Sequence, residues 1–372
     1  MFVEITNTPR DYAWGSSSAI AELLGTTPSG RPEAELWLGA HPGSPARIVG
    51  EDRTLLDVVD GRLPFLLKVL AAAEPLSLQA HPTPAQAAEG FARENAAGIP
   101  LDAVHRNYKD AFHKPELIYA LSDPFRALSG FRPVSETRAV LAPVADDPRI
   151  APLVARLADD AALETVFAWL ISRAEGVEDL VAAVVEAAST VDGPSWQTVR
   201  TLAEHYPGDP GIVISLLLHT VELRPGEVLY LPAGNIHAYL EGLGIELMAS
   251  SDNVLRGGLT PKHIDIPELL GVLDFRPLPA PFLEPEEAEP GVKVFRPDVD
   301  DFQLTVVDAV AARRGVELRL DGPAIALCTS GSFALDGGPR LDRGSAVYVA
   351  GEPWLGLRGD GTLFLASGAV AS

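Results

Sequence analysis

Four side chains that can bind a divalent metal ion stand in three separate stretches of the sequence. They are Gln79, His81, Glu116 and His237. Two imidazoles, a carboxylate and an amide oxygen form a mixed nitrogen and oxygen donor set, which suits a borderline ion such as zinc. Because the amide is neutral, an ion with a single carboxylate ligand keeps a net positive charge, which favours an anionic substrate or intermediate.

Each of these residues also has a plain structural explanation. A histidine on one face of a strand is more often a hydrogen-bonded core residue than a ligand. Glu116 could simply pair with Lys114, two residues earlier, and the separation of His81 from His237 specifies no metal. The residue types alone therefore leave both a metal site and an ordinary polar core open.

Further polar residues follow the same stretches. Side chains alternate along a strand, so Ser77 shares a face with Gln79 and His81, and Tyr239 shares one with His237. Glu246 and Met248 share a face in the next stretch, and Asp252 and Arg256 follow in a polar loop. Arg256 would supply a permanent cation if it reached a cavity. Otherwise it is a surface arginine that pairs with Asp252, four residues earlier.

Short strands must position these side chains. Alternating patterns predict strands over 76–82, 112–120 and 229–231, and an apolar run over 63–70 is interrupted by Lys68. We expect a strand over 237–240, a turn at 241–244 and then another strand. Thr83 followed by Pro84 predicts the start of a helix, because threonine caps helices and proline suits their first position.

A helical segment interrupts this β pattern. Residues 134–206 are rich in Ala, Leu, Val, Asp and Glu, with apolar residues at helical spacing. The segment 212–218, which follows Asp209-Pro210, is also expected to be helical. Strand patterns resume at Val221 and continue after a proline-rich break over 277–290.

The second β region echoes the first. Residues 224–232 resemble residues 343–350, and the alignment places Trp354 where His237 stands. No histidine follows His263. We therefore expect two related β-barrels, one with a polar site and one filled by apolar side chains, with Trp354 in its interior.

Bulk properties narrow the class of protein. The chain has 372 residues, 47% of them hydrophobic, with 33 glycines and 32 prolines, which suits a turn-rich β protein of two or three domains. A formal charge of −22 argues against nucleic acid or an anionic membrane as partner. Cys328 is the single cysteine, and neither a signal-like N-terminal pattern nor a membrane-spanning apolar run is present, so a cytoplasmic, soluble protein is expected.

Several motifs together resemble the type I mannose-6-phosphate isomerases, zinc enzymes of the cupin superfamily. The matching pieces are Tyr12-Ala-Trp-Gly, Ala34-Glu-Leu-Trp-Leu-Gly-Ala-His-Pro, Leu76-Ser-Leu-Gln-Ala-His-Pro, His113-Lys-Pro-Glu, Leu231-Pro-Ala-Gly-Asn-Ile-His-Ala-Tyr and Ser250-Ser-Asp-Asn-Val-Leu-Arg-Gly-Gly-Leu-Thr-Pro-Lys. The resemblance implies that one zinc ion is bound by Gln79, His81, Glu116 and His237. It also implies that Arg256 and Lys114 act in catalysis and that the substrate contacts Ser77, Tyr239, Glu246 and Asp252.

The resemblance also implies a fold, which agrees with the echo. The fold is mainly β, with two cupin-type β-barrels (jelly rolls) and an α-helical domain. Residues 1–133 and 207–266 would form the catalytic cupin domain, 134–206 the helical insert, and 267–372 a metal-free cupin domain. One departure is Thr83-Pro84, because family members often carry an acidic or amide residue and then a lysine there, so this chain lacks that lysine.

The implied activity interconverts mannose 6-phosphate and fructose 6-phosphate through an enediol(ate), and a monomer is expected. One rival is a cupin that binds a sugar phosphate without turning it over, which the presence of Lys114 and of the segment from Asp252 to Arg256 disfavours. The other is a metal-dependent cupin oxygenase, which the glutamine ligand disfavours. Assaying both hexose phosphates with and without a chelator separates the three.

Overall fold

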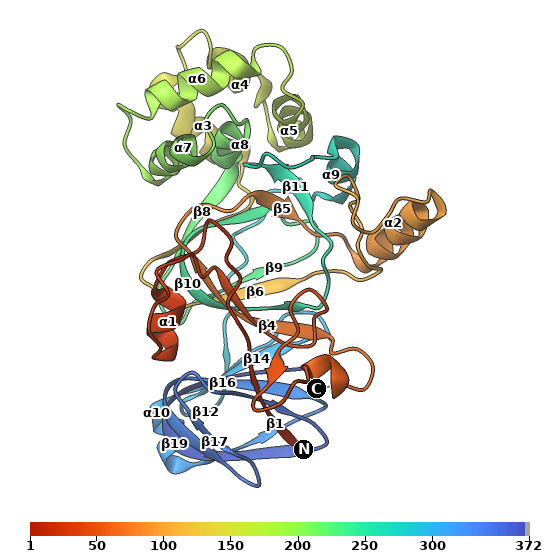
Figure 1. Cartoon of the computed structure of the whole chain (residues 1–372). Coiled ribbons are helices and arrows are strands. Elements are labelled where there is room, and N and C mark those ends of the chain that lie inside the picture. Colours follow the sequence, from red (N-terminus) through yellow and green to blue (C-terminus); the bar gives the residue numbers. More distant parts are fainter. Residues whose placement is uncertain (369–372) are drawn as a thin grey trace.

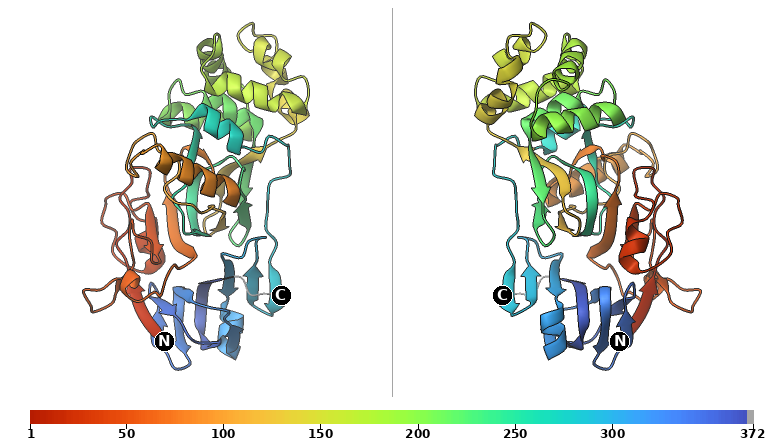
Figure 2. Two further views of the ribbon diagram at one scale, coloured as in Figure 1. Left: turned by 90° about the vertical axis from the view of Figure 1, so that its right-hand side faces the viewer. Right: turned by 90° about the vertical axis from the view of Figure 1, so that its left-hand side faces the viewer.

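The computed structural model describes residues 1–368 as two β-sheets and a group of helices, stacked along one axis (Figures 1 and 2). The nine-stranded middle sheet comprises β2 (Glu35–Leu38), β4 (Phe65–Ala72), β5 (Leu78–Ala80), β6 (Glu116–Ala120), β7 (Phe125–Phe131), β8 (Leu218–Leu223), β9 (Val228–Leu231), β10 (His237–Ala249) and β11 (Leu255–Gly258). The long strand β10 pairs with β4, β5, β6 and β7 and is therefore the centre of this sheet.

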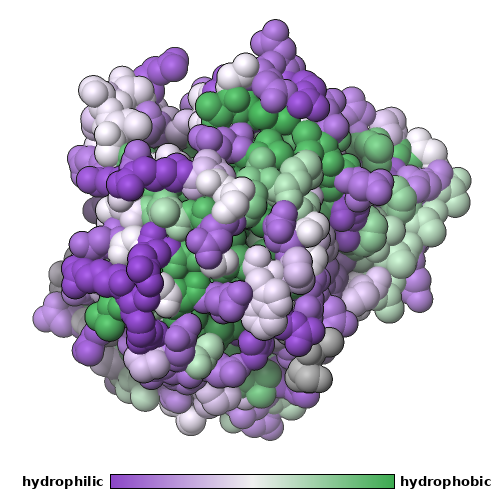
Figure 3. Space-filling model, turned by 90° about the horizontal axis from the view of Figure 1, so that it is seen from below, coloured by the Kyte–Doolittle hydropathy of each residue, from purple (hydrophilic) through white to green (hydrophobic). Residues whose placement is uncertain are grey.

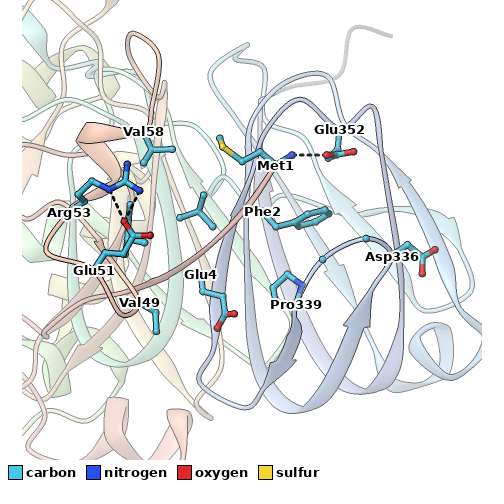
Figure 4. Close-up of a pocket in the computed structure, with 14 residues that line it drawn as sticks. Met1, Phe2, Glu4, Val49, Glu51, Arg53, Val58, Asp336, Pro339 and Glu352 are labelled. Atoms are coloured by element: carbon cyan, nitrogen blue, oxygen red, sulfur yellow. Dashed lines mark hydrogen bonds and ion pairs between the residues drawn. The ribbon is translucent and has the colours of Figure 1, made fainter.

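The ten-stranded sheet lies below it in Figure 1. It comprises β1 (Phe2–Thr6), β3 (Arg47–Ile48), β12 (Glu286–Glu289), β13 (Val292–Phe295), β14 (Gln303–Val307), β15 (Val316–Arg319), β16 (Ala324–Leu335), β17 (Arg340–Asp342), β18 (Ala346–Val349) and β19 (Trp354–Ser367). The first strand of the chain thus pairs with a strand near its end, and Figure 4 shows Met1 and Phe2 lying against that sheet.

Along the sequence, most of the helices lie between strands of the middle sheet. They are α1 (Ala19–Leu24), α2 (Pro84–Ala96), α3 (Val134–Leu141), α4 (Ala151–Arg156), α5 (Leu163–Ile171), α6 (Val177–Ala187), α7 (Pro194–His205), α8 (Gly211–Ile214), α9 (Ile266–Val272) and α10 (Ala309–Arg314), with 3-10 turns η1 (Leu55–Asp57), η2 (Ala142–Val144), η3 (Asp160–Ala162) and η4 (Ser215–Leu217). Helices α3 to α8 gather at the upper end, where their apolar faces form one buried cluster.

Local sequence signals explain several of these elements. Thr83 Oγ1 accepts a hydrogen bond from the backbone N–H of Gln86, and Gln86 Oε1 accepts one from the backbone N–H of Thr83, so α2 begins with the predicted cap. The helical segment expected over 134–206 is confirmed by α3 to α7, and the helix expected over 212–218 by α8 and η4. None of the helices within residues 1–368 is long and apolar enough to cross a lipid bilayer.

The turn predicted at residues 241–244 is wrong. The chain continues through it as part of β10, a single strand from His237 to Ala249. A β-bulge lies between Tyr239 and Glu241, where one extra residue stands opposite β7. Gly242 has a φ of 131°, a conformation that glycine tolerates. The glycines therefore permit a distorted strand instead of ending it.

The two sheets share a hydrophobic interface. The outer face of β4, β6 and β10 contributes Val69, Leu117 and Leu247, and the facing strands contribute residues such as Leu304 and Phe364. A separate cluster of buried apolar residues, which includes Phe333, Cys328 and Leu363, packs on the ten-stranded sheet. From below, hydrophilic residues cover most of this end of the molecule, with hydrophobic residues visible between them (Figure 3).

The interior position predicted for Trp354 is wrong. Trp354 is the first residue of β19, just as His237 is the first residue of β10. Yet its side chain is 52% exposed, because it lies at the end of β19 opposite Arg319 of the edge strand β15. The apolar interior is built by other residues.

Candidate metal centre

A cavity of about 1170 Å³ lies against the nine-stranded sheet. Its wall is formed by side chains from β2, β4, β5, β6, β10 and β11, together with the loop 101–109. Eight of the predicted site residues line it: Ser77, Gln79, Lys114, Glu116, Tyr239, Glu246, Asp252 and Arg256. The remaining two, His81 and His237, are completely buried.

Three of the predicted ligands converge at this cavity. His81 Nε2 lies 3.4 Å from Glu116 Oε1, and His237 Nε2 lies 3.3 Å from Glu116 Oε2. Candidate donor atoms of all three residues lie within 4.8 Å of one another. His81 Nε2, His237 Nε2 and Glu116 Oε2 are buried without a hydrogen-bond partner. Because buried polar atoms are nearly always paired, these orphaned atoms fit a metal ion.

The orientation of both imidazoles supports this interpretation. His81 Nδ1 lies 2.8 Å from the carbonyl oxygen of Asn253, and His237 Nδ1 lies 3.1 Å from that of Asn235. A ring nitrogen that donates to a carbonyl carries the proton, so the Nε2 atom of each ring is left with a free lone pair. This arrangement is typical of metal-binding histidines.

Gln79 belongs to the same face of the sheet. It stands directly opposite His237 on β10 and directly opposite Arg256 on β11. Directly opposed residues of antiparallel strands project to the same side. The neutral amide is therefore placed beside the imidazole of His237, where it could complete a four-ligand set.

Burial and nearby charges shift the pKa values of His81 and Glu116. Burial is the main cause that lowers the pKa of His81, to about 4. Burial would raise the pKa of Glu116, but the Lys114 ammonium, together with the contacts from the His237 and His81 imidazoles, outweighs burial and holds it well below the usual range. The imidazole of His81 is thus neutral and Glu116 ionised at neutral pH, which are the forms that bind metal.

The ion pair between Glu116 and Lys114, which the sequence offered as an alternative to a metal site, is also present. Lys114 Nζ donates to Glu116 Oε1, and both side chains reach the cavity despite Pro115 between them. The pairing and the metal centre are thus compatible, because Glu116 has a second oxygen that faces His237.

Two charged residues that accompany Glu246 in the cavity wall, Lys68 and Glu35, were not assigned a role by sequence reasoning. Lys68 Nζ lies 2.9 Å from Glu246 Oε2 and 3.4 Å from Glu35 Oε1, and Glu35 accepts a hydrogen bond from the Trp37 indole. Lys68 stands opposite both Trp37 and Glu246 in register, so all three face the cavity. The one available signal was a lysine within an apolar strand.

Lys68, Glu35 and Glu246 keep opposite charges together in the protein interior. Burial would lower the pKa of Lys68, but the nearby Glu246, Glu35 and Glu116 carboxylates outweigh burial and raise it. Burial raises the pKa of Glu246, although Lys68 opposes the effect. Burial and the charge of Glu246 likewise raise the pKa of Tyr239. Lys68 is consequently a cation and Tyr239 a neutral hydroxyl at neutral pH.

The bulge in β10 explains how odd-numbered and even-numbered residues of the same strand reach one cavity. Tyr239 has an odd number and Glu246 an even one, so an undistorted strand would send them to opposite faces. The extra residue between Tyr239 and Glu241 reverses the alternation. Both side chains consequently line the same wall.

Arg256 does not form the surface pair with Asp252 that its spacing had left open. Its Nη1 donates to Ser77 Oγ at 2.9 Å, whereas Asp252 Oδ1 lies 3.3 Å from His41 Nε2. Burial lowers the pKa of Arg256, and the charge of Arg256 is the main cause that lowers the pKa of the nearby Lys262. Two cations therefore stand close together at the cavity wall, where an anion would relieve their repulsion.

Comparison with known proteins identifies relatives of the whole chain. A family model described as "Phosphomannose isomerase type I, catalytic domain" matches residues 2–134. The mannose-6-phosphate isomerase of Salmonella typhimurium is 41% identical, with 94% of this chain and 93% of the relative aligned. That of Escherichia coli is also 41% identical, with 97% and 98% aligned.

Solved structures give the same result for the fold. A zinc-bound mannose 6-phosphate isomerase superposes with a TM-score of 0.91 at 39% identity, covering 99% of this chain and 100% of the other. The Salmonella typhimurium enzyme bound to its substrate fructose 6-phosphate and to zinc gives the same values.

Proposed function

The chain belongs to the type I phosphomannose isomerase family, and we propose that it interconverts mannose 6-phosphate and fructose 6-phosphate with one zinc ion. The single observation that carries this proposal is the set of orphaned donor atoms on His81, Glu116 and His237 at the cavity. Full-length relatives named mannose-6-phosphate isomerase support it, as do the structural neighbours bound to zinc and to fructose 6-phosphate.

We assign the ligands as Gln79, His81, Glu116 and His237. When bound, zinc acts as a Lewis acid that polarises the substrate carbonyl and stabilises negative charge on its oxygen. The chain's own contribution is to hold the two imidazoles through Asn253 and Asn235 and to keep Glu116 ionised.

Arg256 and Lys114 are the proposed catalytic residues. The reaction moves a proton between C2 and C1 through an enediol(ate), so negative charge develops on the substrate oxygens. Arg256 presents a planar, permanently charged guanidinium from β11, and Lys114 presents an ammonium beside Glu116. Both would stabilise that charge, because fixed cations in a desolvated cavity act strongly on a developing oxyanion.

Ser77, Tyr239, Glu246 and Asp252 are the proposed substrate-binding residues. Their hydroxyl and carboxylate groups line the cavity and can bind sugar hydroxyls. Lys68 adds a cation next to Glu246. Asp252 is half exposed at the mouth, whereas Tyr239 and Glu246 are buried in the wall, so the four residues offer contacts at different depths.

We further propose the finer architecture that the family implies. Residues 1–133 and 207–266 form the catalytic cupin-type barrel, 134–206 the helical domain and 267–372 a second, metal-free cupin-type barrel. The separate apolar cluster of the ten-stranded sheet supports the last of these divisions. Strand β1 is an addition from the N-terminal segment to the second unit.

A cytoplasmic monomer that binds no nucleic acid completes the proposal. The formal charge of −22 opposes binding to polyanions, and the single cysteine suits a reducing compartment. Size-exclusion chromatography with light scattering tests the monomer, since a dimer would have twice the chain mass of 39.4 kDa.

The deciding experiment couples metal analysis to turnover. Purified protein should contain close to one zinc per chain, convert mannose 6-phosphate to fructose 6-phosphate, lose activity with a chelator and regain it with added zinc. Binding of either sugar phosphate without turnover would favour a passive binding protein. Metal-dependent oxygen consumption would favour a cupin oxygenase.

A further inference from the structure

One ion pair connects the ten-stranded sheet to the segment that presents Lys114 and Glu116. His113 Nε2 lies 2.7 Å from Asp301 Oδ2, and the two side chains are only 19% and 16% exposed. His113 directly precedes Lys114, whereas Asp301 lies in the loop between β13 and β14 of the other sheet. The contact therefore joins parts of the molecule that are 188 residues apart in sequence.

The Asp301 side of this contact is firmly anchored. Phe295 ends β13 and Phe302 precedes β14, and both rings are completely buried in the interface between the two sheets. Within the same loop, Arg296 Nε donates to Gln303 Oε1 at 2.9 Å. A carboxylate between two buried rings has little freedom, so it can impose a position on its partner.

The His113 side leads to the metal centre through the main chain. The carbonyl oxygen of Phe112 accepts hydrogen bonds from Ser251 Oγ at 3.1 Å and from Asn253 Nδ2 at 2.8 Å. Asn253 is the residue whose own carbonyl holds His81 Nδ1. A shift of residues 112–113 would thus disturb Lys114 and Glu116 on one side and His81 on the other.

Arg62 reinforces the same corner. Its guanidinium lies 3.6 Å from the centre of the Phe112 ring and donates to the carbonyl oxygen of Ser250 at 2.7 Å. The charges of Asp301 and Asp110 partly offset the loss of solvation that lowers the pKa of this arginine. Asp301 therefore acts on two residues of the corner, because it hydrogen-bonds His113 and its charge favours the cationic form of Arg62.

We propose that Asp301 is a positioning residue for the isomerase reaction, which holds His113 and through it the segment 112–116 that carries Lys114 and Glu116. This inference rests on the proposed function for its kinetic readout, but not for its metal-binding readout. It gives the ten-stranded sheet a role in the chemistry although that sheet contributes no side chain to the proposed reacting centre.

The test compares Asp301→Ala and Asp301→Asn with Asp300→Ala, a change of the exposed neighbouring carboxylate in the same loop. Zinc affinity is measured by chelator competition, and turnover by steady-state kinetics with mannose 6-phosphate. We expect Asp301→Ala to weaken zinc binding and lower kcat by about tenfold each, the lower end for residues that orient ligands. We expect Asp301→Asn to recover part of both because its amide oxygen still accepts a hydrogen bond, and Asp300→Ala to match the wild type.

A double variant separates positioning from general stability. If Asp301 acts through His113, then Asp301→Ala combined with His113→Ala should be no worse than His113→Ala alone. Wild-type zinc affinity and kcat in a folded Asp301→Ala protein would overturn the inference, as would fully additive effects. If the wild-type protein binds zinc but does not turn over the sugar phosphate, the proposed function fails while zinc affinity still tests the role of Asp301.

Discussion

At the residue scale, Arg256 offers the sharpest test of the chemistry. Its guanidinium donates to a neutral serine hydroxyl and reaches the cavity wall, so its charge is available to a substrate. We expect Arg256→Ala to lower kcat by about a hundredfold to a thousandfold, as for the loss of one oxyanion donor, while zinc stays bound. Steady-state kinetics with zinc analysis measures this.

Whether Arg256→Ala changes kcat or KM shows which role the arginine has. A raised KM with kcat nearly unchanged would mean that the arginine holds only the phosphate. The matched control is Arg126→Ala, which removes an arginine paired with Glu222 and Glu241 at the surface. Wild-type kinetics in both variants would remove Arg256 from the site.

Acid should destabilise the metal-free protein through His81. Its pKa is about 4 in the folded protein against 6.5 ordinarily, so the unfolded chain binds a proton that the folded chain excludes. Unfolding is therefore favoured as the pH falls from about 6.5 towards 4. Urea unfolding of chelator-treated protein at pH 7 and pH 5 should show a lower midpoint at pH 5.

Zinc should stabilise the folded protein, because it binds the folded chain and not the unfolded one. A ligand present at about a thousand times its dissociation constant stabilises the folded state by about 4 kcal/mol. The urea midpoint at pH 7 should therefore rise when zinc is restored. His237→Ala should abolish that rise while His219→Ala, a histidine whose ring bonds the Leu278 carbonyl away from the centre, should keep it.

The cluster of His81, Glu116 and His237 could be anticipated from sequence because each residue stands in a short motif on or beside a strand. His81 and His237 needed only the alternation of side chains and a family resemblance to be brought together. Lys68 and Glu35 could not be assigned a role, because their importance lies in pairing across strands, and strand register is not written in either segment alone.

At the element scale, β16 and β19 each carry an aromatic residue, and the two differ in burial. Phe333 on β16 is completely buried, whereas Trp354 on β19 is 52% exposed. We expect Phe333→Ala to lower the free energy of unfolding by about 3–5 kcal/mol. Trp354→Ala should cost much less, and equal losses in chemical denaturation would contradict this account of the interior.

The misplacement of Trp354 shows where alignment stops being informative. The echo aligned β9 and β10 with β18 and β19, and in both places a short strand is followed by a long one. It could not tell which side chains point inwards at a strand end, since that depends on the neighbouring strand. For the same reason, the glycines of β10 were interpreted as a turn, whereas pairing with β4 and β6 keeps them in the strand.

At the scale of the whole molecule, Cys328 can report on the opening of the ten-stranded sheet. Burial raises the pKa of its thiol to about 11, and the side chain is completely buried. At pH 8 the native protein should therefore react with a thiol reagent only as fast as the sheet opens. Adding denaturant should make the reaction rapid, which absorbance of the released thiolate measures.

The same thiol predicts a loss of stability in alkali. The unfolded chain loses the proton near pH 9, before the folded chain does near pH 11, so its contribution is intact below about pH 9 and disappears towards pH 11. Cys328→Ala should remove this contribution, so the variant should lose less stability than the wild type between pH 9 and pH 11. In the reactivity experiment, a rapid reaction of Cys328 with the thiol reagent in the native protein at pH 8 would show that the sheet is open much of the time.

The pairing of β1 with β18 has a consequence for the time course of biosynthesis. Phe2 to Ile5 pair with β18 at residues 346–349, and the Met1 amine bonds Glu352 and the Ala350 carbonyl (Figure 4). The first strand to leave the ribosome therefore waits for partners made about 340 residues later. At typical rates of translation that wait lasts on the order of 20 to 70 s. During that interval, one edge of β1 has to be kept from aggregation by the growing chain or by chaperones.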